Sequence, residues 1–135
     1  MRTVREIIDP NPYWLPDDMP LGRVAEELAE RQISAAPVCT RDGKIIGVLS
    51  NTDLTQHYNG DEPGLARDAM TPEILSVRAD AAAEVAIERM AFEGVHQLVV
   101  IDDDDRFVGV VTAMDILREL AGYGRAPPRT FAVAP

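Results

Sequence analysis

The sequence has few residues suited to disulfide, thiol or metal chemistry. Among its 135 residues there is one cysteine, Cys39, which excludes an internal disulfide and a zinc site built from several cysteines. Cys39 lies in an apolar run, so we expect it to pack as a small hydrophobic residue and not to act as a nucleophile. The only histidines, His57 and His96, are far apart in the chain. They form a poor basis for a metal site.

Positive charge is also scarce. Thirteen Lys and Arg residues stand against 23 Asp and Glu residues, which gives a net charge of −10. Such a surface repels nucleic acid phosphates and anionic lipid, so we expect neither a nucleic acid nor a membrane partner. No apolar run approaches the roughly 20 residues of a membrane span, and Arg5 and Glu6 interrupt any secretory signal. These absences favour a cytoplasmic protein.

What the sequence does contain is an internal repeat. A shift of 62 residues aligns residues 4–58 with residues 66–120 without a gap. VREIIDP then falls on ARDAMTP, and VCTRDGKIIGVLSNTDL falls on VIDDDDRFVGVVTAMDI. Self-similarity of this kind predicts two structurally equivalent units. The expected division is unit 1–58, a turn-rich linker at 59–65, unit 66–122 and a flexible C-terminal tail at 123–135.

Both repeats carry the same local signals in the same order. Apolar residues at helical spacing predict an amphipathic helix, formed by Leu21, Val24, Ala25, Leu28 and Ala29 or by Ala83, Ala86, Ile87, Met90 and Ala91. We expect Asp18 and Asp80 to cap these helices. Two strands joined by a polar turn follow, at 37–40 and 45–49 or at 98–102 and 107–111. A second helix begins near Thr52 or Met114. The Asp102–Asp105 run lacks the alternation of a calcium loop and is expected to be a solvated hairpin turn.

The corner after the second strand of each repeat is the most informative motif. It runs GVLSNTD at 47–53 and GVVTAMD at 109–115. A glycine inside a strand, as at Gly47 and Gly109, indicates that another group approaches closely. The Ser-x-x-Asp and Thr-x-x-Asp spacings are those of a capping box, which starts a helix without any ligand. The alternative is a site in which the helix N-terminus attracts phosphate and the aspartate accepts ribose hydroxyls. The motif alone leaves both interpretations open.

Two units of order β-α-β-β-α, each with G-x-x-[ST]-x-x-D at its corner, resemble a tandem pair of CBS domains, or Bateman module. The resemblance covers about residues 1–122 and is closest over 33–54 and 95–116. It implies an α+β fold in which a pseudo-two-fold pair of CBS units packs through its sheets. It also implies a sensor with two clefts between the paired copies. In this family such clefts bind AMP, ADP, ATP or S-adenosylmethionine.

The resemblance assigns ligand-binding roles residue by residue. Asp53 and Asp115 would take the ribose hydroxyls, and Ser50 and Thr112 would lie near the ribose or phosphate. The adenine would contact the residues that enter the hairpin, namely Ile33, Ser34, Ala35, Val95, His96 and Gln97. Asp115 would work with Ile33 and Ser34, and Asp53 with Val95 and His96. His96 is expected to be a partly buried histidine with partners of its own, and the alternative is that it hydrogen-bonds the ligand.

One departure from the family pattern concerns charge. Strong nucleotide binders often carry a basic residue where Ala35 and Gln97 stand here. Without that cation, and with a net charge of −10, a triphosphate would be poorly compensated. This favours AMP, or another ligand of low phosphate charge, over ATP.

No nucleophile, base and orienting group can be identified together, so we do not expect an enzyme, a catalytic residue, a metal or an obligatory cofactor. The leading hypothesis is a regulatory adenosine-ligand sensor of the stand-alone type, which acts on a separate protein effector or through its oligomer. The resemblance implies a homodimer with facing helices, for which Leu28, Ala29, Met90 and Ala91 are one candidate surface. The alternative is a ligand-free dimerisation or interaction module whose corners only cap helices.

Overall fold

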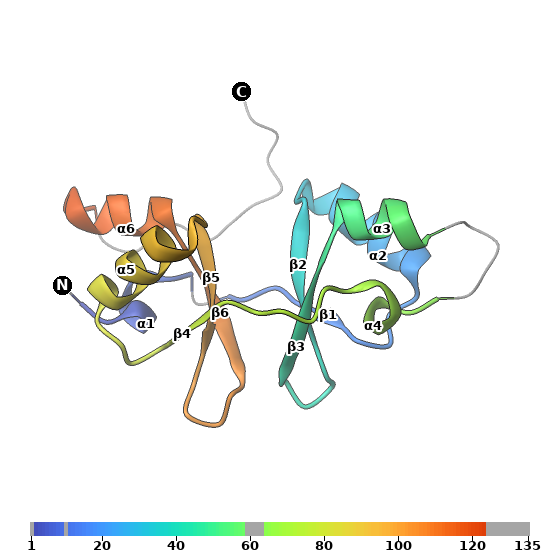
Figure 1. Ribbon diagram of the computed structural model, residues 1–135, viewed down its shortest axis with the longest axis horizontal. Helices are drawn as coiled ribbons and strands as arrows, with labels where there is room; N and C mark the ends of the chain where they lie inside the picture. Colours follow the sequence, from blue (N-terminus) through green and yellow to red (C-terminus); the bar gives the residue numbers. More distant parts are fainter. Residues whose placement is uncertain (1, 10, 59–63, 124–135) are drawn as a thin grey trace. The chain divides into compact units, whose positions relative to one another are not determined.

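The computed structural model describes residues 2–9, 11–58 and 64–123 (Figure 1). Most of the predicted linker and nearly all of the predicted C-terminal tail therefore lie outside the described residues. Contacts divide the chain into two compact units. Unit 1 is drawn from residues 1–12 and 75–129, and unit 2 chiefly from residues 13–74. Within the described ranges, no helix is long and apolar enough to cross a membrane.

Unit 2 contains one three-stranded sheet with helices. Its elements are β1 (Leu15–Pro16), α2 (Leu21–Arg31), β2 (Ala35–Cys39), β3 (Ile45–Ser50), α3 (Asn51–His57) and α4 (Ala66–Ala69). The sheet order is β1-β2-β3, with β1 parallel and β3 antiparallel to β2. A register shift lies between Val38 and Cys39.

Unit 1 repeats this arrangement. Its elements are α1 (Val4–Ile7), β4 (Ser76–Arg78), α5 (Ala83–Glu93), β5 (Gln97–Ile101), β6 (Phe107–Thr112) and α6 (Ala113–Leu120). The sheet order β4-β5-β6 has the same parallel and antiparallel pairs, and its register shift lies between Val100 and Ile101. The predicted β-α-β-β-α order is confirmed in both units, with element ends displaced by one or two residues.

Each unit has its own apolar core. Leu21, Val24 and Leu28 of α2 are buried in unit 2, and Ala83, Ala86 and Met90 of α5 are buried in unit 1. The predicted helical stripe therefore serves the core, whereas Ala29 and Ala91 at its edge are exposed. Cys39 is fully buried, as expected for a packing residue, and burial raises the pKa of its thiol to about 12.

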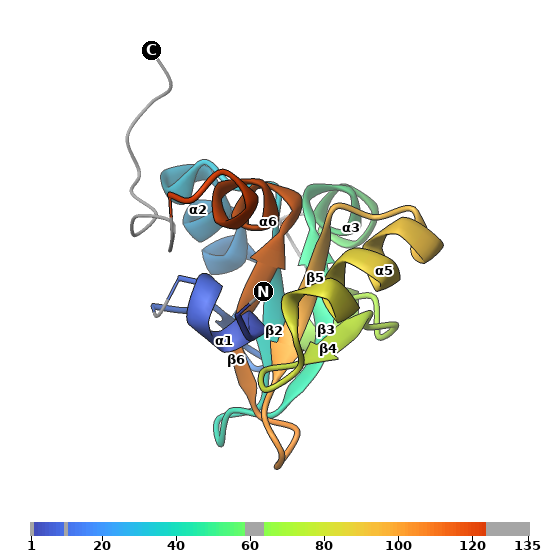
Figure 2. The same cartoon turned by 90° about the vertical axis from the view of Figure 1, so that its left-hand side faces the viewer.

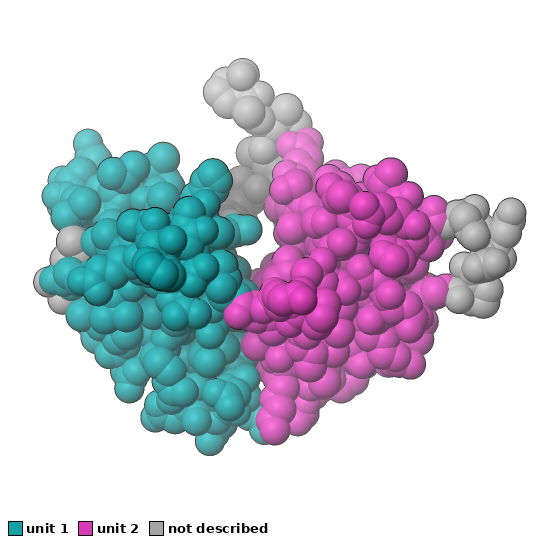
Figure 3. All heavy atoms as spheres, viewed as in Figure 1, with its two compact units in different colours: residues 1–12, 75–129 teal, residues 13–74, 130–135 magenta. Residues whose placement is uncertain are grey.

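The compact units do not follow the sequence repeat at its first segment. The α1 segment packs against α6 and β6, which come from the other repeat (Figure 2). The α4 segment packs in the same way against α3 and β3. Figure 3 colours the two resulting units, and residues 2–9 belong to the unit formed by the second repeat whereas residues 64–72 belong to the unit formed by the first. We call residues 2–9 and 64–72 the exchanged segments.

The exchanged segments explain the two strand glycines. A Cβ built on Gly47 would lie 2.6 Å from Sδ of Met70 and 2.9 Å from the carbonyl oxygen of Thr71. A Cβ on Gly109 would lie 3.0 Å from Cδ1 of Ile8. The predicted close approach is confirmed, and the approaching group is the exchanged segment.

The exchanged segments also replace the predicted helix caps. Asp18 and Asp80 were expected to cap α2 and α5, and this expectation is wrong. The N-cap residues are Pro20 and Ala82, and neither provides a side-chain cap. The Leu21 amide instead donates to the Gly64 carbonyl oxygen at 2.9 Å, and the Ala83 amide donates to that of Arg2 at 3.0 Å. Backbone carbonyls thus satisfy helix donors that a carboxylate would otherwise accept from.

The acidic run in unit 1 forms the predicted hairpin turn. The Asp102 amide donates to the Arg106 carbonyl oxygen at 3.0 Å, and Asp102 Oδ1 accepts from the amides of Asp104 and Arg106. These amide donors hold the pKa of the Asp102 carboxyl below its ordinary value. Asp103, Asp104 and Asp105 are exposed.

Candidate functional site

In unit 2, the corner between β3 and α3 is closed by a reciprocal pair of side chains. The Asp53 amide donates to Ser50 Oγ at 3.1 Å. Asp53 Oδ2 accepts from the Ser50 amide at 2.9 Å and from the Ser50 hydroxyl at 3.0 Å. The capping-box interpretation of this motif is therefore confirmed. The Asp53 side chain is partly buried.

The corner between β6 and α6 in unit 1 has the same geometry. The Asp115 amide donates to Thr112 Oγ1 at 3.1 Å, and the Thr112 amide donates to Asp115 Oδ2 at 2.8 Å. Asp115 is more buried than Asp53, because only 5% of it is exposed. Both corners are therefore closed by hydrogen bonds of their own before any ligand is considered.

Each unit brings the predicted adenine-contacting segment to its own corner. The Asn51 amide donates to the Ser34 carbonyl oxygen at 2.9 Å, and the Ala113 amide donates to that of His96 at 2.9 Å. In the sheet register, Ala35 pairs with Ser50 and Gln97 pairs with Thr112. The predicted residues thus form two equivalent clusters, one per unit: Ile33, Ser34, Ala35, Ser50 and Asp53, and Val95, His96, Gln97, Thr112 and Asp115. That residues of one copy work with residues of the other stays a prediction.

The clusters present polar groups at their surface. Ser34, His96 and Gln97 are exposed, whereas Ile33 and Val95 are partly buried. The expectation that His96 is partly buried is therefore wrong, because it stands where the chain enters β5 at the surface.

Thr71 is a site residue that the sequence analysis missed. Its hydroxyl donates to Asp53 Oδ1 at 3.3 Å, so a hydroxyl from the exchanged segment reaches the second carboxylate oxygen. Two backbone hydrogen bonds with Val48, of 2.9 and 2.8 Å, fix Thr71 beside β3. The repeat aligns Thr71 with Asp9. That alignment does not show that either residue packs onto the other repeat.

The arginines that form ion pairs in each unit do so away from the corners. In unit 2, Arg41 pairs with Asp18 at 2.8 Å and Arg67 with Asp17 at 3.4 Å. In unit 1, Arg2 pairs with Glu119 at 2.6 Å, and Arg78 pairs with Asp103. Within the described residues, neither Asp53 nor Asp115 forms an ion pair. In that part of the chain, the partners of both capping carboxylates are thus hydroxyl and amide donors and not a paired cation.

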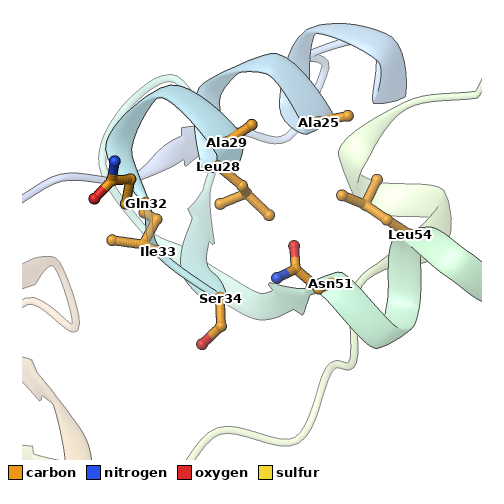
Figure 4. Close-up of a pocket in the computed structure, with 8 residues that line it drawn as sticks. All are labelled: Ala25, Leu28, Ala29, Gln32, Ile33, Ser34, Asn51 and Leu54. Atoms are coloured by element: carbon orange, nitrogen blue, oxygen red, sulfur yellow. The ribbon is translucent and has the colours of Figure 1, made fainter. Parts of the chain in front are cut away.

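A hollow of about 430 Å³ lies beside the unit 2 corner (Figure 4). It opens between α2 and α3, where Leu28 and Leu54 face one another. Its lining combines apolar and neutral polar residues: Ala25, Leu28, Ala29, Gln32, Ile33, Ser34, Asn51 and Leu54. Two predicted site residues, Ile33 and Ser34, are among them, but Asp53 is not. The hollow therefore adjoins the corner and shares Ile33 and Ser34 with the unit 2 cluster, but the Asp53 carboxylate does not line it.

Two equivalent units with matching capped corners define a tandem repeat protein of the α+β class. A family model described as the CBS domain matches residues 4–60 and again residues 66–122. The chain therefore belongs to the CBS domain family and carries two CBS domains in tandem.

Similar proteins include both longer chains and isolated domain pairs. The inosine-5'-monophosphate dehydrogenase of Methanocaldococcus jannaschii is 29% identical over 103 residues, which cover 76% of this chain and 20% of the dehydrogenase. This chain spans between 14% and 50% of the length of eight curated relatives.

Two solved structures have the same fold. The CBS domain pair of protein MJ0100, in complex with 5'-methylthioadenosine and S-adenosylmethionine, has a TM-score of 0.71 and 22% identity, covering 91% of this chain and 98% of that one. CBSX2 in complex with AMP has a TM-score of 0.74 and 21% identity, with the same coverage of 91% and 98%.

Proposed function

We propose that this protein is a regulatory module that binds an adenosine-containing ligand at its two carboxylate corners. CBS domain pairs are regulatory ligand-binding modules, and structural neighbours bind AMP, S-adenosylmethionine and methylthioadenosine. The observation that carries the proposal is the repeated corner. In each unit, the first helical turn holds an aspartate beside the residues that enter the hairpin.

The capping box does not use up the acceptor capacity of these aspartates. A carboxylate has about four acceptor positions on two oxygens. The Asp115 Oδ2 atom accepts from the Thr112 amide, which leaves further positions for the vicinal hydroxyls of a ribose. Asp53 accepts from the Ser50 amide and hydroxyl and from the Thr71 hydroxyl, so about one position remains there, and a ribose would displace the Thr71 hydroxyl to gain a second. Because the cap already fixes the carboxylate, the ligand would meet a preorganised acceptor.

The charge of the group at the 5' position should determine which adenosine compounds bind most tightly. A neutral or cationic 5' group, such as a thioether or sulfonium, suits a corner that carries a carboxylate and no ion-paired cation. A monophosphate adds modest repulsion that the helix N-terminus can offset. A triphosphate adds several charges with no Arg or Lys at positions 35 or 97 to meet them. We therefore expect methylthioadenosine, S-adenosylmethionine and AMP to bind more tightly than ATP.

Thermal unfolding with each of these compounds tests the proposal. A ligand at 100 times its dissociation constant should stabilise the protein by about 2.7 kcal/mol. Asp53→Asn and Asp115→Asn keep a capping oxygen but remove the charge, and each should reduce the ligand-induced shift. Alanine is the poorer probe, because loss of a cap alone costs about 1 kcal/mol without ligand.

Two matched controls carry the same kind of capping carboxylate elsewhere. Asp68 Oδ2 accepts from the Leu65 amide at 2.9 Å, and Glu6 Oε1 accepts from the Thr3 amide at 3.0 Å. Asp68→Asn and Glu6→Gln should leave the ligand-induced shift unchanged. The proposal fails if these controls and the corner variants respond alike, or if no adenosine compound stabilises the protein.

A ligand-free interaction module is the second candidate, and one observation favours it. Both corners are complete capping boxes without any ligand. On this account the aspartates only start helices, and their substitution lowers unfolding stability equally with and without nucleotides.

A further inference from the structure

The carboxylates of the two corners differ in the donors that they already hold. In unit 1, Asp115 Oδ2 accepts from the Thr112 amide at 2.8 Å, and Asp115 Oδ1 accepts from no donor within the described residues. In unit 2, Asp53 Oδ2 accepts from the amide and the hydroxyl of Ser50. Asp53 Oδ1 also accepts, from the Thr71 hydroxyl at 3.3 Å. One carboxylate therefore keeps an oxygen for a ligand, whereas the other has donors on both oxygens.

The exchanged segments are the source of this difference. The repeat aligns Thr71 with Asp9. The Thr71 carbonyl oxygen lies 2.9 Å from a Cβ built on Gly47, and the Asp9 carbonyl oxygen lies 3.6 Å from one built on Gly109, so both backbones pass the strand glycine of their unit. A threonine hydroxyl can donate a hydrogen bond, but an ionised carboxylate can only accept. Asp9 therefore cannot give the unit 1 corner the donor that Thr71 gives the unit 2 corner.

The backbone around Thr71 keeps its hydroxyl beside Asp53. Two backbone hydrogen bonds with Val48, of 2.9 and 2.8 Å, hold the segment against β3. The branched side chain has few favourable χ1 angles, so the hydroxyl is confined to few positions. A group held in this way competes at a high effective concentration, because it belongs to the same chain. Rotation about χ1 is enough to withdraw the hydroxyl, and the exchanged segment stays in place.

We infer that Thr71 is an internal competitor of the ligand, so that the unit 1 corner fills first and the unit 2 corner fills at higher ligand concentration. This inference rests on the proposed function. The two vicinal hydroxyls of a ribose can both donate to Asp115 without displacing a donor, whereas Asp53 must first lose the Thr71 hydroxyl. One neutral hydrogen bond corresponds to a difference of about threefold to tenfold in affinity.

The burial of the carboxylates acts in the same direction. Only 5% of Asp115 is exposed, whereas Asp53 is partly buried. A hydrogen bond to a carboxylate with little water around it is stronger than one to a hydrated carboxylate. Two corners of unequal affinity would let one chain respond to two ranges of ligand concentration.

Calorimetric titration of variants with a single intact corner tests the inference, with methylthioadenosine and AMP as probes. Asp53→Asn weakens the unit 2 corner and so reports the unit 1 corner, and Asp115→Asn does the reverse. The unit 1 corner should bind about threefold to tenfold more tightly. Thr71→Val keeps the branched shape and removes the donor. Added to Asp115→Asn it should recover about that factor, and added to Asp53→Asn it should change nothing.

Two further variants serve as controls. The Thr55 hydroxyl donates to the Asn51 carbonyl oxygen at 2.9 Å on the same helix as Asp53, so Thr55→Val removes a hydroxyl without touching the corner. It should leave both affinities unchanged. Thr71→Ser keeps a hydroxyl and should keep the weaker binding of the unit 2 corner. Circular dichroism checks the fold, and Thr71→Ala replaces Thr71→Val if the valine variant does not fold.

The outcomes separate this inference from the proposed function. If neither compound binds the wild type or any variant, both are wrong. If the corners bind equally, or if Thr71→Val leaves the unit 2 affinity unchanged, adenosine binding stands and competition by Thr71 is overturned. Weaker binding in Thr71→Val would also overturn it, because the hydroxyl would then donate to the ligand. An equal gain in Thr55→Val would show that the effect does not come from Asp53.

Discussion

Units 1 and 2 have equivalent strand registers, including the shift after Val38 and after Val100, yet their exchanged segments pack at different distances. At Gly47 the nearest atoms include the backbone oxygen of Thr71, whereas at Gly109 the nearest atom is the methyl end of Ile8. A backbone atom cannot move without shifting its segment, but a side-chain end can rotate. The comparison teaches that one sequence motif can be constrained to different degrees in two copies.

The largest expected effect tests this difference directly. Gly47→Ala should destabilise the protein by about 2–3 kcal/mol, because the added methyl group overlaps the Thr71 carbonyl and Met70. Gly109→Ala should cost about 1 kcal/mol or less, since Ile8 can adopt another rotamer. Urea unfolding of the two variants measures both values.

A double variant separates the side chain from the backbone at this position. Adding Met70→Ala to Gly47→Ala removes the sulfur contact but leaves the Thr71 carbonyl in place, so it should restore only part of the loss. Equal losses at Gly47 and Gly109 would contradict the account, since the two approaches would then be equally adaptable.

At two equivalent positions with left-handed backbone, one unit has glycine and the other has a different residue. After α2 the left-handed residue is Gln32, with φ 55°, whereas after α5 it is Gly94, with φ 70°. In the hairpin turn the order is reversed, with Gly43 at φ 91° in unit 2 and Asp105 at φ 61° in unit 1. Each unit therefore has one position with a strained backbone, and the other unit has glycine at the equivalent position, where the strain is absent.

Glycine substitution at the two strained positions is the second prediction. Gln32→Gly and Asp105→Gly should each stabilise the protein by about 0.5 kcal/mol. Glycine removes the backbone strain of the folded state, and this gain exceeds the loss that comes from the greater conformational entropy of the unfolded chain. Thermal or urea unfolding measures the gain. Gly94→Ala is the matched reverse change and should cost about 1 kcal/mol. A loss in Gln32→Gly would show that its side chain contributes more than its backbone costs.

Much of this fold could be predicted because its signals are local. The repeat, the helical spacing of Leu21 to Leu28 and the Ser50-x-x-Asp53 capping box depend on residues close in sequence. The strand glycines indicated a close approach but could not identify the approaching group. The exchanged segments, the Thr71 hydroxyl on Asp53 and the failure of Asp18 as a cap all depend on contacts between the repeats, which one sequence without tertiary information does not contain.

The smallest expected effect concerns acid. In unit 1, the Thr3 amide lowers the pKa of Glu6, the Arg106 and Asp104 amides lower that of Asp102, and the Arg2 guanidinium lowers that of Glu119. In unit 2, the Arg41 guanidinium lowers the pKa of Asp18. A carboxyl with a lowered folded-state pKa contributes stability that is present above its unfolded pKa and is lost as pH falls through the folded value.

Unit 1 should therefore lose more stability than unit 2 as pH falls below the ordinary carboxyl values of 4.5 for Glu and 3.8 for Asp. Hydrogen exchange of backbone amides in each unit, measured at pH 6 and below about pH 4, compares the two losses. Arg2→Gln removes the partner of Glu119 and should reduce the acid sensitivity of unit 1 alone, while Arg41→Gln should act only on unit 2. Because both ion pairs are at the surface, added salt should reduce both effects. If Arg2→Gln changed both units equally, the units would unfold as one, and their differences in packing would not translate into separate stabilities.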